Sequence, residues 1–267
     1  MAFVHELFDI SGKIAVITGA STGLGWDAAC ALGECGCKII ITSRDLAKAQ
    51  NAAIELEKMG YEATGLELDQ RNYESCVFLM KAVMDKYGRI DILINNAGGG
   101  AGKGECNLFK RDPEAIQNMI DTNLTGSLFC CKAACEYLAK QGSGSIINLG
   151  SIAGVVGRMR DLYYEANKME QPVEYAAAKG GVIGMTRDLA AVMAPFGVRV
   201  NSVSPGGFDK GELPQPFIDG YAKRTPMGHM GVIGKEIKGT IIFLASEASG
   251  YITGQNLIVD GGFSSCK

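Results

Sequence analysis

Short apolar runs alternate with longer amphipathic stretches along this chain. The short runs are rich in β-branched residues and apolar at nearly every position, which is typical of strands buried on both faces of a parallel sheet. They predict seven strands, at residues 13–17, 38–42, 65–68, 90–94, 145–149, 198–203 and 256–259. The longer stretches repeat apolar residues at helical spacing and predict helices at residues 23–35, 46–59, 72–87, 113–140, 173–196 and 235–245.

Strand and helix follow each other from one end of the chain to the other. This order is typical of right-handed βαβ units wound on both faces of one sheet. We therefore expect an α/β protein with a single domain over residues 1–267 and a doubly wound, seven-stranded parallel sheet. Two segments that follow strands interrupt the order, residues 154–172 and the proline-rich residues 205–230. We interpret both as candidate substrate loops, because ligands of such sheets lie beyond the carboxyl ends of the strands.

The composition is that of a globular protein. Of the 267 residues, 47% are hydrophobic and 21% are charged, which is ample material for a core. Lys and Arg number 26 against 29 Asp and Glu, so the chain lacks the basic excess that nucleic-acid binding needs. No apolar stretch reaches the length of a membrane helix or a signal-peptide core. We expect a cytoplasmic protein with no nucleic-acid or membrane partner.

Cysteine and glycine usage narrow the chemistry. The nine cysteines form no C-x-x-C pair and have no histidines at metal-ligand spacing, which predicts free thiols and no metal site. Glycine is abundant, and several glycines follow the first predicted strand in the segment Thr18-Gly19-Ala20-Ser21-Thr22-Gly23-Leu24-Gly25. A glycine-rich turn between a strand and a helix lets the backbone approach a pyrophosphate, which the helix N-terminus stabilises. The spacing differs from G-x-G-x-x-G, so an ordinary turn is the alternative.

Tyr175 and Lys179 stand four residues apart on a predicted helix. Such residues share one helical face, and a lysine cation there favours the tyrosinate. A tyrosine of this kind can exchange a proton with a substrate hydroxyl or carbonyl group. The spacing alone does not decide the site, because Tyr164 and Lys168 repeat it.

In this order the motifs resemble the short-chain dehydrogenase/reductase family. The resemblance extends from Gly12 to Gly262 and is carried by the glycine-rich turn, Asp69, Asn95-Asn96-Ala97-Gly98, Asn123, Ser151, Tyr-x-x-x-Lys and Pro205-Gly206. It implies a Rossmann fold, a homotetramer, and an enzyme that interconverts an alcohol and a ketone by hydride transfer with a nicotinamide cofactor. Members similar to gluconate 5-dehydrogenase and to 3-oxoacyl-acyl-carrier-protein reductase resemble this chain most.

The resemblance also implies the site residues. The catalytic tetrad would be Asn123, Ser151, Tyr175 and Lys179. Tyr175 would exchange the proton, Ser151 would hydrogen-bond the reacting oxygen, Lys179 would hold the ribose and stabilise the tyrosinate, and Asn123 would anchor a water. Cofactor contacts are implied for residues of all the motifs: Gly19, Ser21, Thr22, Gly23, Leu24, Gly25, Ser43, Arg44, Asp69, Asn95, Ala97, Gly98, Tyr175, Lys179, Pro205 and Gly206.

The choice between the two tyrosines depends on Pro172. Tyr164 lies thirteen residues after Ser151, which is close to the family's usual spacing. Its helix would however meet Pro172, which disfavours a helix running through that position. Small residues and an apolar-periodic helix follow Tyr175. We therefore predict Tyr175 and Lys179 as the catalytic pair. Relative to the family's spacing, residues 154–172 are then an insertion beside the active site.

The end of the second predicted strand bears on the cofactor. An acidic residue there binds the ribose 2′-hydroxyl of NAD, whereas an arginine accommodates the 2′-phosphate of NADP. Ser43 occupies the place of the acid and Arg44 follows it, so NADP(H) is favoured. NAD(H) stays an alternative because Asp45 is close to this position and could bind the ribose 2′-hydroxyl. Arg44 could also be a solvated charge in a loop.

The loops suggest a small, polar substrate. Candidate contacts are Ser151, Arg158, Tyr163, Tyr164 and Gly207, with further donors at Arg160, Lys103, Lys210, Arg224 and His229. These groups suit a sugar acid or a polyol, although any one of them is equally compatible with a solvated rim. The alternatives are a reductase of 3-oxoacyl thioesters and, more remotely, a non-catalytic dinucleotide-binding regulator.

Overall fold

A computed structural model describes residues 3–99 and 105–265. Its central sheet has the strands β1 (Ile14–Ile17), β2 (Lys38–Ser43), β3 (Ala63–Glu67), β4 (Ile92–Asn95), β5 (Gly144–Leu149), β6 (Val198–Pro205) and β9 (Asn256–Val259). They run parallel in the order β3-β2-β1-β4-β5-β6-β9. The seven predicted strands are confirmed, with ends that move by no more than two residues.

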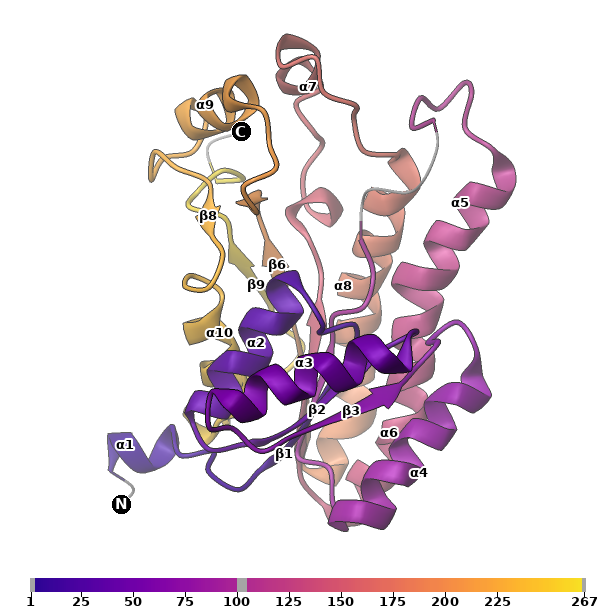
Figure 1. Ribbon diagram of the computed structural model, residues 1–267, viewed down its shortest axis with the longest axis vertical. Helices are drawn as coiled ribbons and strands as arrows, with labels where there is room; N and C mark the ends of the chain where they lie inside the picture. The colour runs from indigo at the N-terminus through magenta and orange to yellow at the C-terminus, as the bar shows by residue number, and fades with distance from the viewer. Residues whose placement is uncertain (1–2, 100–104, 266–267) are drawn as a thin grey trace.

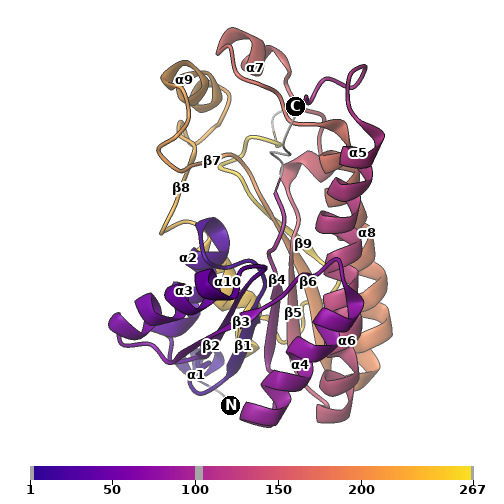
Figure 2. The same ribbon diagram turned by 45° about the vertical axis from the view of Figure 1, so that its right-hand side comes forward.

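Helices cover both faces of this sheet (Figures 1 and 2). One layer holds α2 (Gly23–Glu34), α3 (Leu46–Lys58) and α10 (Lys238–Ala245), and the other holds α4 (Tyr73–Tyr87), α6 (Gly126–Gln141) and α8 (Val173–Met193). Alternate residues of a strand point to opposite faces, so Ala15 and Ile17 join the first core cluster while Ile14 and Val16 join the second. The single doubly wound domain is confirmed.

The helix predicted at residues 113–140 is interrupted. It consists of α5 (Pro113–Ile120), a π-helical turn η1 (Asp121–Thr125) and α6. The buried residue Asn123 lies in that turn. Single π-helical turns inside α-helices are frequent at functional sites. The spacing of apolar residues did not predict this turn, because no proline or glycine directly precedes it to mark a break in the helix.

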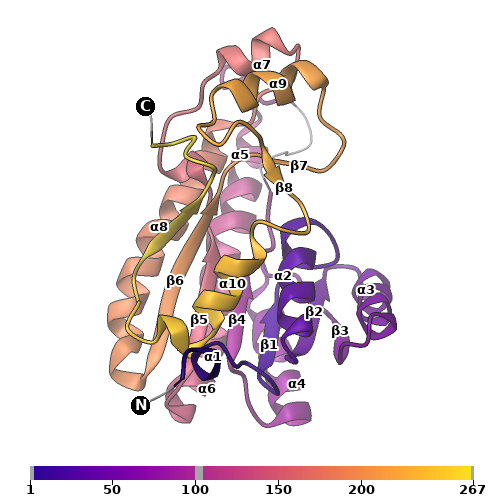
Figure 3. The same ribbon diagram turned by 90° about the vertical axis from the view of Figure 1, so that its left-hand side faces the viewer.

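Short elements cap the carboxyl ends of the strands. Residues 154–172 contain α7 (Asp161–Glu165), and residues 205–230 contain α9 (Gln215–Lys223). These helices lie side by side above the sheet (Figures 1 and 3) and share a small core with Met230 and Phe263. The remaining elements are α1 (Val4–Leu7), a two-stranded sheet of β7 (Phe208–Asp209) and β8 (Gly231–Val232), and the 3-10 turns η2 (Ile152–Gly154), η3 (Ala194–Phe196) and η4 (Glu247–Ser249).

In the described part of the chain, no helix is both long and apolar enough to cross a lipid bilayer.

Gly65 permits the close packing of α3 on β3. A Cβ atom at this position would overlap the Ala49 carbonyl group and come within 2.5 Å of the Gln50 nitrogen. We expect Gly65→Ala to lower the free energy of unfolding by about 1–3 kcal/mol, because an overpacked backbone contact must open. Urea denaturation at one protein concentration measures this.

Gly239 provides the matched control. It is exposed on α10, and a Cβ atom there meets nothing within 4 Å. Gly239→Ala should raise the free energy of unfolding by up to about 1 kcal/mol through helix propensity. Equal effects of the two substitutions would contradict the packing argument.

Candidate active site

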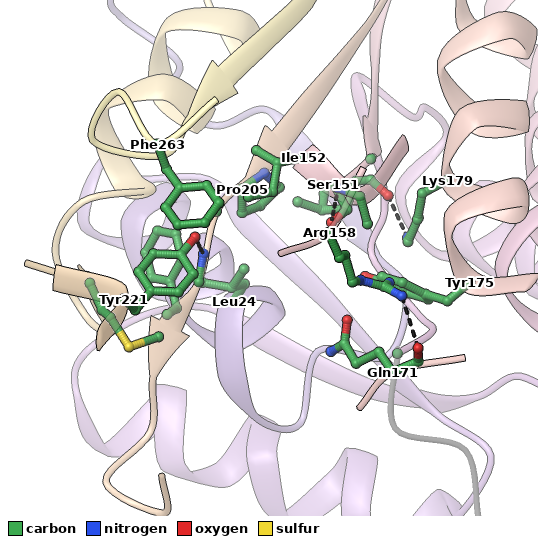
Figure 4. A pocket seen from close by; sticks show the side chains of 18 of the residues that line it. Leu24, Ser151, Ile152, Arg158, Gln171, Tyr175, Lys179, Pro205, Tyr221 and Phe263 are labelled. Atoms are coloured by element: carbon green, nitrogen blue, oxygen red, sulfur yellow. Dashed lines mark hydrogen bonds between the residues drawn. The ribbon is translucent and has the colours of Figure 1, made fainter. Parts of the chain in front are cut away.

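A cavity of about 420 Å³ opens at the carboxyl ends of the central strands. Its walls come from the turn after β1, the segment that follows β5, the insertion at residues 154–172 and the loop at residues 205–230 (Figure 4). The order of strands reverses between β1 and β4, which is the position where open α/β sheets bind ligands. Sequence motifs that lie far apart in the chain meet here.

Hydrogen bonds join the glycine-rich turn to the segment after β4. The Thr18 hydroxyl accepts the backbone N–H groups of Asn96 at 3.0 Å and Ala97 at 2.9 Å. The Asn96 amide donates to the carbonyl oxygens of Thr18 at 3.0 Å and Gly19 at 2.9 Å. A Cβ atom at Gly19 would lie 2.7 Å from Ala97, and the φ of Gly19 is +60°, so glycine is required. The two motifs therefore hold each other in place.

The N-terminus of α2 borders the cavity. Gly23 begins the helix with a φ of +65°, and a Cβ atom there would lie 3.0 Å from the Lys210 amine. Thr22, Gly23, Leu24 and Lys210 all line the cavity. Unpaired N–H groups at a helix start and a nearby lysine form an environment that favours phosphate oxygens.

The charged residues that follow β2 and β3 do not line the cavity. Asp45 caps α3 by accepting the Lys48 N–H at 3.2 Å, and its own N–H donates to the Ser43 hydroxyl at 3.2 Å. Asp69 forms a bidentate pair with Arg71 at 3.0 and 2.7 Å. Hydrogen bonds from Arg71 and the charge of Arg44 lower the pKa of Asp69. Both carboxylates thus have partners, while Arg44 is exposed.

Lys179 and Tyr175 lie one turn apart on α8, beside the end of β5. The Lys179 ammonium group is buried and donates to the Leu149 carbonyl oxygen at 2.6 Å. Its Nζ atom is 5.8 Å from the centre of the Tyr175 ring. Burial lowers the pKa of Lys179 to about 8. Burial raises the pKa of Tyr175, whereas a hydrogen bond with Ser151 and the charge of Arg158 lower it.

Ser151 and Asn123 occupy different positions relative to the cavity. The Ser151 hydroxyl lines the cavity and caps η2 by accepting the Ala153 N–H at 3.1 Å. Asn123 does not line it. Its side chain exchanges hydrogen bonds with the backbone of Gly99, at 2.9 and 3.3 Å, and also donates to the Met119 carbonyl oxygen at 3.1 Å. Asn123 therefore secures the segment after β4.

The insertion brings Arg158 against Tyr175. The Arg158 guanidinium lies 5.4 Å from the centre of the Tyr175 ring, and its Nη1 atom donates to the carbonyl oxygens of Gln171 and Pro172, both at 3.1 Å (Figure 4). Tyr163 lines the cavity and packs edge-on against Phe217, with ring centres 5.1 Å apart. Tyr164, a predicted substrate contact, is 66% exposed and lies outside the cavity lining. It lies on α7, which turns it to the surface.

The other predicted residues divide into two groups. Those that line the cavity are Gly19, Thr22, Gly23, Leu24, Gly98, Ser151, Arg158, Tyr163, Tyr175, Lys179, Pro205, Gly206 and Gly207. Those outside its lining are Ser21, Gly25, Ser43, Arg44, Asp69, Asn95, Ala97 and Asn123. Of the further donors, Lys210 lines the cavity, Arg160 pairs with Glu170, Arg224 contacts Asp161 and Glu165, and His229 contacts the Met230 carbonyl oxygen. Lys103 lies outside the described residues.

The lining residues that the sequence reasoning missed include Lys168, Tyr221 and Phe263. Lys168 places its amine 5.5 Å from the Phe217 ring centre, and the second Tyr-x-x-x-Lys was the available signal. Tyr221 and Phe263 stack at 4.2 Å, and the Tyr221 hydroxyl accepts the Gly207 N–H at 2.6 Å. Nothing local marks these two residues. Within the described residues, no group of three or more His, Cys, Asp or Glu side chains is arranged to hold a metal ion.

Comparison with known proteins gives relatives along almost the full length. A sequence model of a family described as enoyl-(acyl carrier protein) reductase matches residues 19–264. A 3-oxoacyl-[acyl-carrier-protein] reductase of Synechocystis sp. is 36% identical over 255 residues, which cover 95% of this chain and 97% of the relative. An NADP-dependent mannitol dehydrogenase of Aureobasidium melanogenum is 34% identical over 267 residues, covering 97% of this chain and 94% of the relative.

Solved structures agree with these relatives. The crystal structure of a gluconate 5-dehydrogenase from Burkholderia cenocepacia, in complex with NADP and tartrate, superposes with a TM-score of 0.88. It is 31% identical and covers 99% of this chain and 100% of that chain. Fold, motifs and relatives lead to one conclusion. The chain belongs to the short-chain dehydrogenase/reductase family and is an oxidoreductase that acts on CH–OH groups with a nicotinamide dinucleotide.

Proposed function

We propose that this protein is an NADP(H)-dependent oxidoreductase that interconverts a secondary alcohol and a ketone on a small polar substrate, such as a sugar acid or a polyol. The observation that carries the proposal is Tyr175, which lines the cavity beside Ser151 with Lys179 one helical turn away. These are the groups that proton exchange with a substrate oxygen requires. A mannitol dehydrogenase relative and a gluconate dehydrogenase neighbour support the choice of substrate.

The residues of the glycine-rich turn fit a dinucleotide. The start of α2 and Lys210 face the same part of the cavity, and the absent side chain of Gly23 leaves the space between them open. Arg44 is exposed after β2, and the neighbouring acid Asp45 is engaged as a helix cap. We therefore propose NADP(H) over NAD(H), with the 2′-phosphate at Arg44. When bound, the nicotinamide supplies or accepts the hydride.

The side chains at the reacting end manage the proton. In reduction, Tyr175 donates its hydroxyl proton to the ketone oxygen, and burial keeps this phenol protonated by raising its pKa. In oxidation the phenolate accepts a proton, and the hydrogen bond with Ser151 favours that form. Lys179 uses one N–H on Leu149 and retains two further donors for ribose hydroxyls. Anchoring of a water by Asn123 stays a prediction, as does the homotetramer.

Reduction of a 3-oxoacyl thioester is a second candidate. The observation in its favour is the 36% identity to the Synechocystis reductase. The cavity lining favours a sugar acid or polyol, because Arg158, Tyr163 and Lys168 from the insertion add polar groups to it. Parallel assays with a short 3-oxoacyl thioester and with polyols and sugar acids separate the two candidates.

Substitution of Tyr175 tests the catalytic assignment. Tyr175→Phe should lower kcat by roughly 10²–10⁴-fold, because general acid–base catalysis contributes that much, while NADPH binding is retained. Tyr164→Phe is the control and should leave turnover unchanged, because its side chain is at the surface. The absorbance of the reduced nicotinamide reports both. Loss of turnover in Tyr164→Phe with normal Tyr175→Phe would reverse the assignment.

Substitution of Arg44 tests the cofactor choice. Arg44→Ala should lower kcat/KM for NADP about tenfold or more and leave the value for NAD unchanged, because a charge-assisted hydrogen bond to the phosphate is lost. Lys48→Ala removes an exposed cation one turn away on α3 and should change neither value. A wild-type preference for NAD would refute the proposal.

Burial of Lys179 predicts a pH-dependent stability. Its pKa of about 8 in the folded protein lies below the 10.5 of the free side chain. From about pH 8 to 10.5 the unfolded chain therefore binds a proton that the folded chain lacks, and folding becomes more favourable as pH rises. Between pH 7 and 9, the wild type should gain about 1 kcal/mol in free energy of unfolding relative to Lys179→Met. Urea denaturation at both pH values measures the gap, and a constant gap would contradict the burial argument.

A further inference from the structure

The charges that line the cavity are of one sign. Among the described residues, the lining includes the cations Arg158, Lys168, Lys179 and Lys210 and no aspartate or glutamate. The chain as a whole carries a formal charge of -3, so the excess is local. A cleft lined by one sign of charge concentrates ligands of the opposite sign.

Two of these cations already have a function in the proposed cofactor site. Lys210 lies over the start of α2, where phosphate oxygens are favoured. Lys179 is held by the Leu149 carbonyl oxygen below Tyr175. The other two, Arg158 and Lys168, both come from the 154–172 insertion and need a separate explanation.

Arg158 is a partly buried cation without a carboxylate partner in the described part of the chain. Two carbonyl oxygens hold its Nη1 atom, but its Nη2 atom is buried and has no hydrogen-bond acceptor there. Its neighbour Arg160 takes the nearby carboxylate, Glu170. An enclosed guanidinium without an anion is costly, so a site that keeps one is prepared for an anionic ligand.

Lys168 extends this cationic environment. Its amine lies 5.5 Å from the Phe217 ring centre and 6.0 Å from that of Tyr163, and no described carboxylate pairs with it. The aromatic rings support a cation but do not neutralise it. Arg158 and Lys168 thus add two positive charges to the part of the cavity that the insertion lines, where the nearby carboxylate Glu170 is paired with Arg160.

We propose that the 154–172 insertion is a carboxylate-binding subsite in which Arg158 and Lys168 select a hydroxy acid, or the corresponding keto acid, over a neutral polyol. This inference rests on the proposed function and decides between the substrates that it allows. The position of Arg158 over the Tyr175 ring holds the carboxylate beside the phenol that exchanges the proton. Two hydrogen bonds to carbonyl oxygens already hold the guanidinium in place, so ligand binding costs little side-chain entropy at Arg158.

Calorimetric titration of the protein saturated with NADP⁺ tests this without turnover. The probes are tartrate and threitol, which share a four-carbon skeleton and differ in their two carboxylates. We expect tartrate to bind at least tenfold more tightly than threitol. Arg158→Gln should lower tartrate affinity at least tenfold and leave threitol affinity unchanged, and Arg158→Lys should retain part of the difference.

Two further variants complete the design. Lys168→Gln breaks no hydrogen bond of its side chain given by the structure and should weaken tartrate binding several-fold, so it tests the subsite even if Arg158→Gln fails to fold. Lys223→Gln removes an exposed cation on α9 outside the cavity lining and should change nothing. Unchanged NADP⁺ affinity confirms that each variant is folded.

The outcomes separate this inference from the proposed function. Equal affinities for tartrate and threitol, or tartrate binding unaffected by both insertion variants, would overturn the subsite. Sorbitol 6-phosphate binding through Arg158 in preference to tartrate would overturn the carboxylate assignment. A wild-type protein that binds tartrate through Arg158 but oxidises and reduces no acid or polyol with NADP(H) would support the subsite and refute the function.

Discussion

The hydrogen bond from the Lys179 ammonium to the Leu149 carbonyl oxygen joins the long helix α8 to the end of β5 in the central sheet. It is made by a cation that is almost fully removed from water, and burial lowers its pKa to about 8. Because Tyr175 is one turn earlier on the same helix, this contact also sets where the phenol stands relative to Ser151. The protein accepts an unfavourable burial at this point in return for a defined site, as many enzymes do.

Around that contact, the two segments that interrupt the βα order close the substrate side. Leu162 of the insertion and Phe217, Tyr221 and Met230 of the loop share one apolar cluster above the strands. The Tyr221 hydroxyl also accepts the Gly207 N–H, so the loop is fastened at its beginning. Apolar packing therefore positions the segments, and their polar side chains remain available to the cavity.

Positively charged side chains lie at both ends of the cavity. Lys210 belongs to the end beside α2, whereas Arg158 lies beside Tyr175 and Lys168 lies beside Tyr163 and Phe217. A dinucleotide and a charged substrate would each meet positive charge at their own end. The same scaffold thus serves different substrates within one family through the loops that its strands carry.

Local signals in the sequence were sufficient for the strands and for the start of α8. β-branched apolar runs predicted the sheet because burial on both faces leaves a continuous pattern. Pro172 is the residue directly before α8, so the two tyrosines lie on different helices. Tyr175 lines the cavity while Tyr164 is exposed, and the catalytic role of Tyr175 stays a prediction. The motif residues that line the cavity were equally readable, because each follows a strand.

Contacts between segments that are distant in the chain could not be predicted from the sequence. The π-helical turn that holds Asn123 has no local signature, because it depends on how α5 and α6 pack against α8. The stacking of Tyr221 on Phe263 joins residues of two separate loops. Lys168 was readable only as a copy of a motif. The sequence by itself determined the sheet and placed Tyr175 and Lys179 on one helix, because these signals are periodic or adjacent, whereas only tertiary packing decided which charges of the insertion enter the cavity.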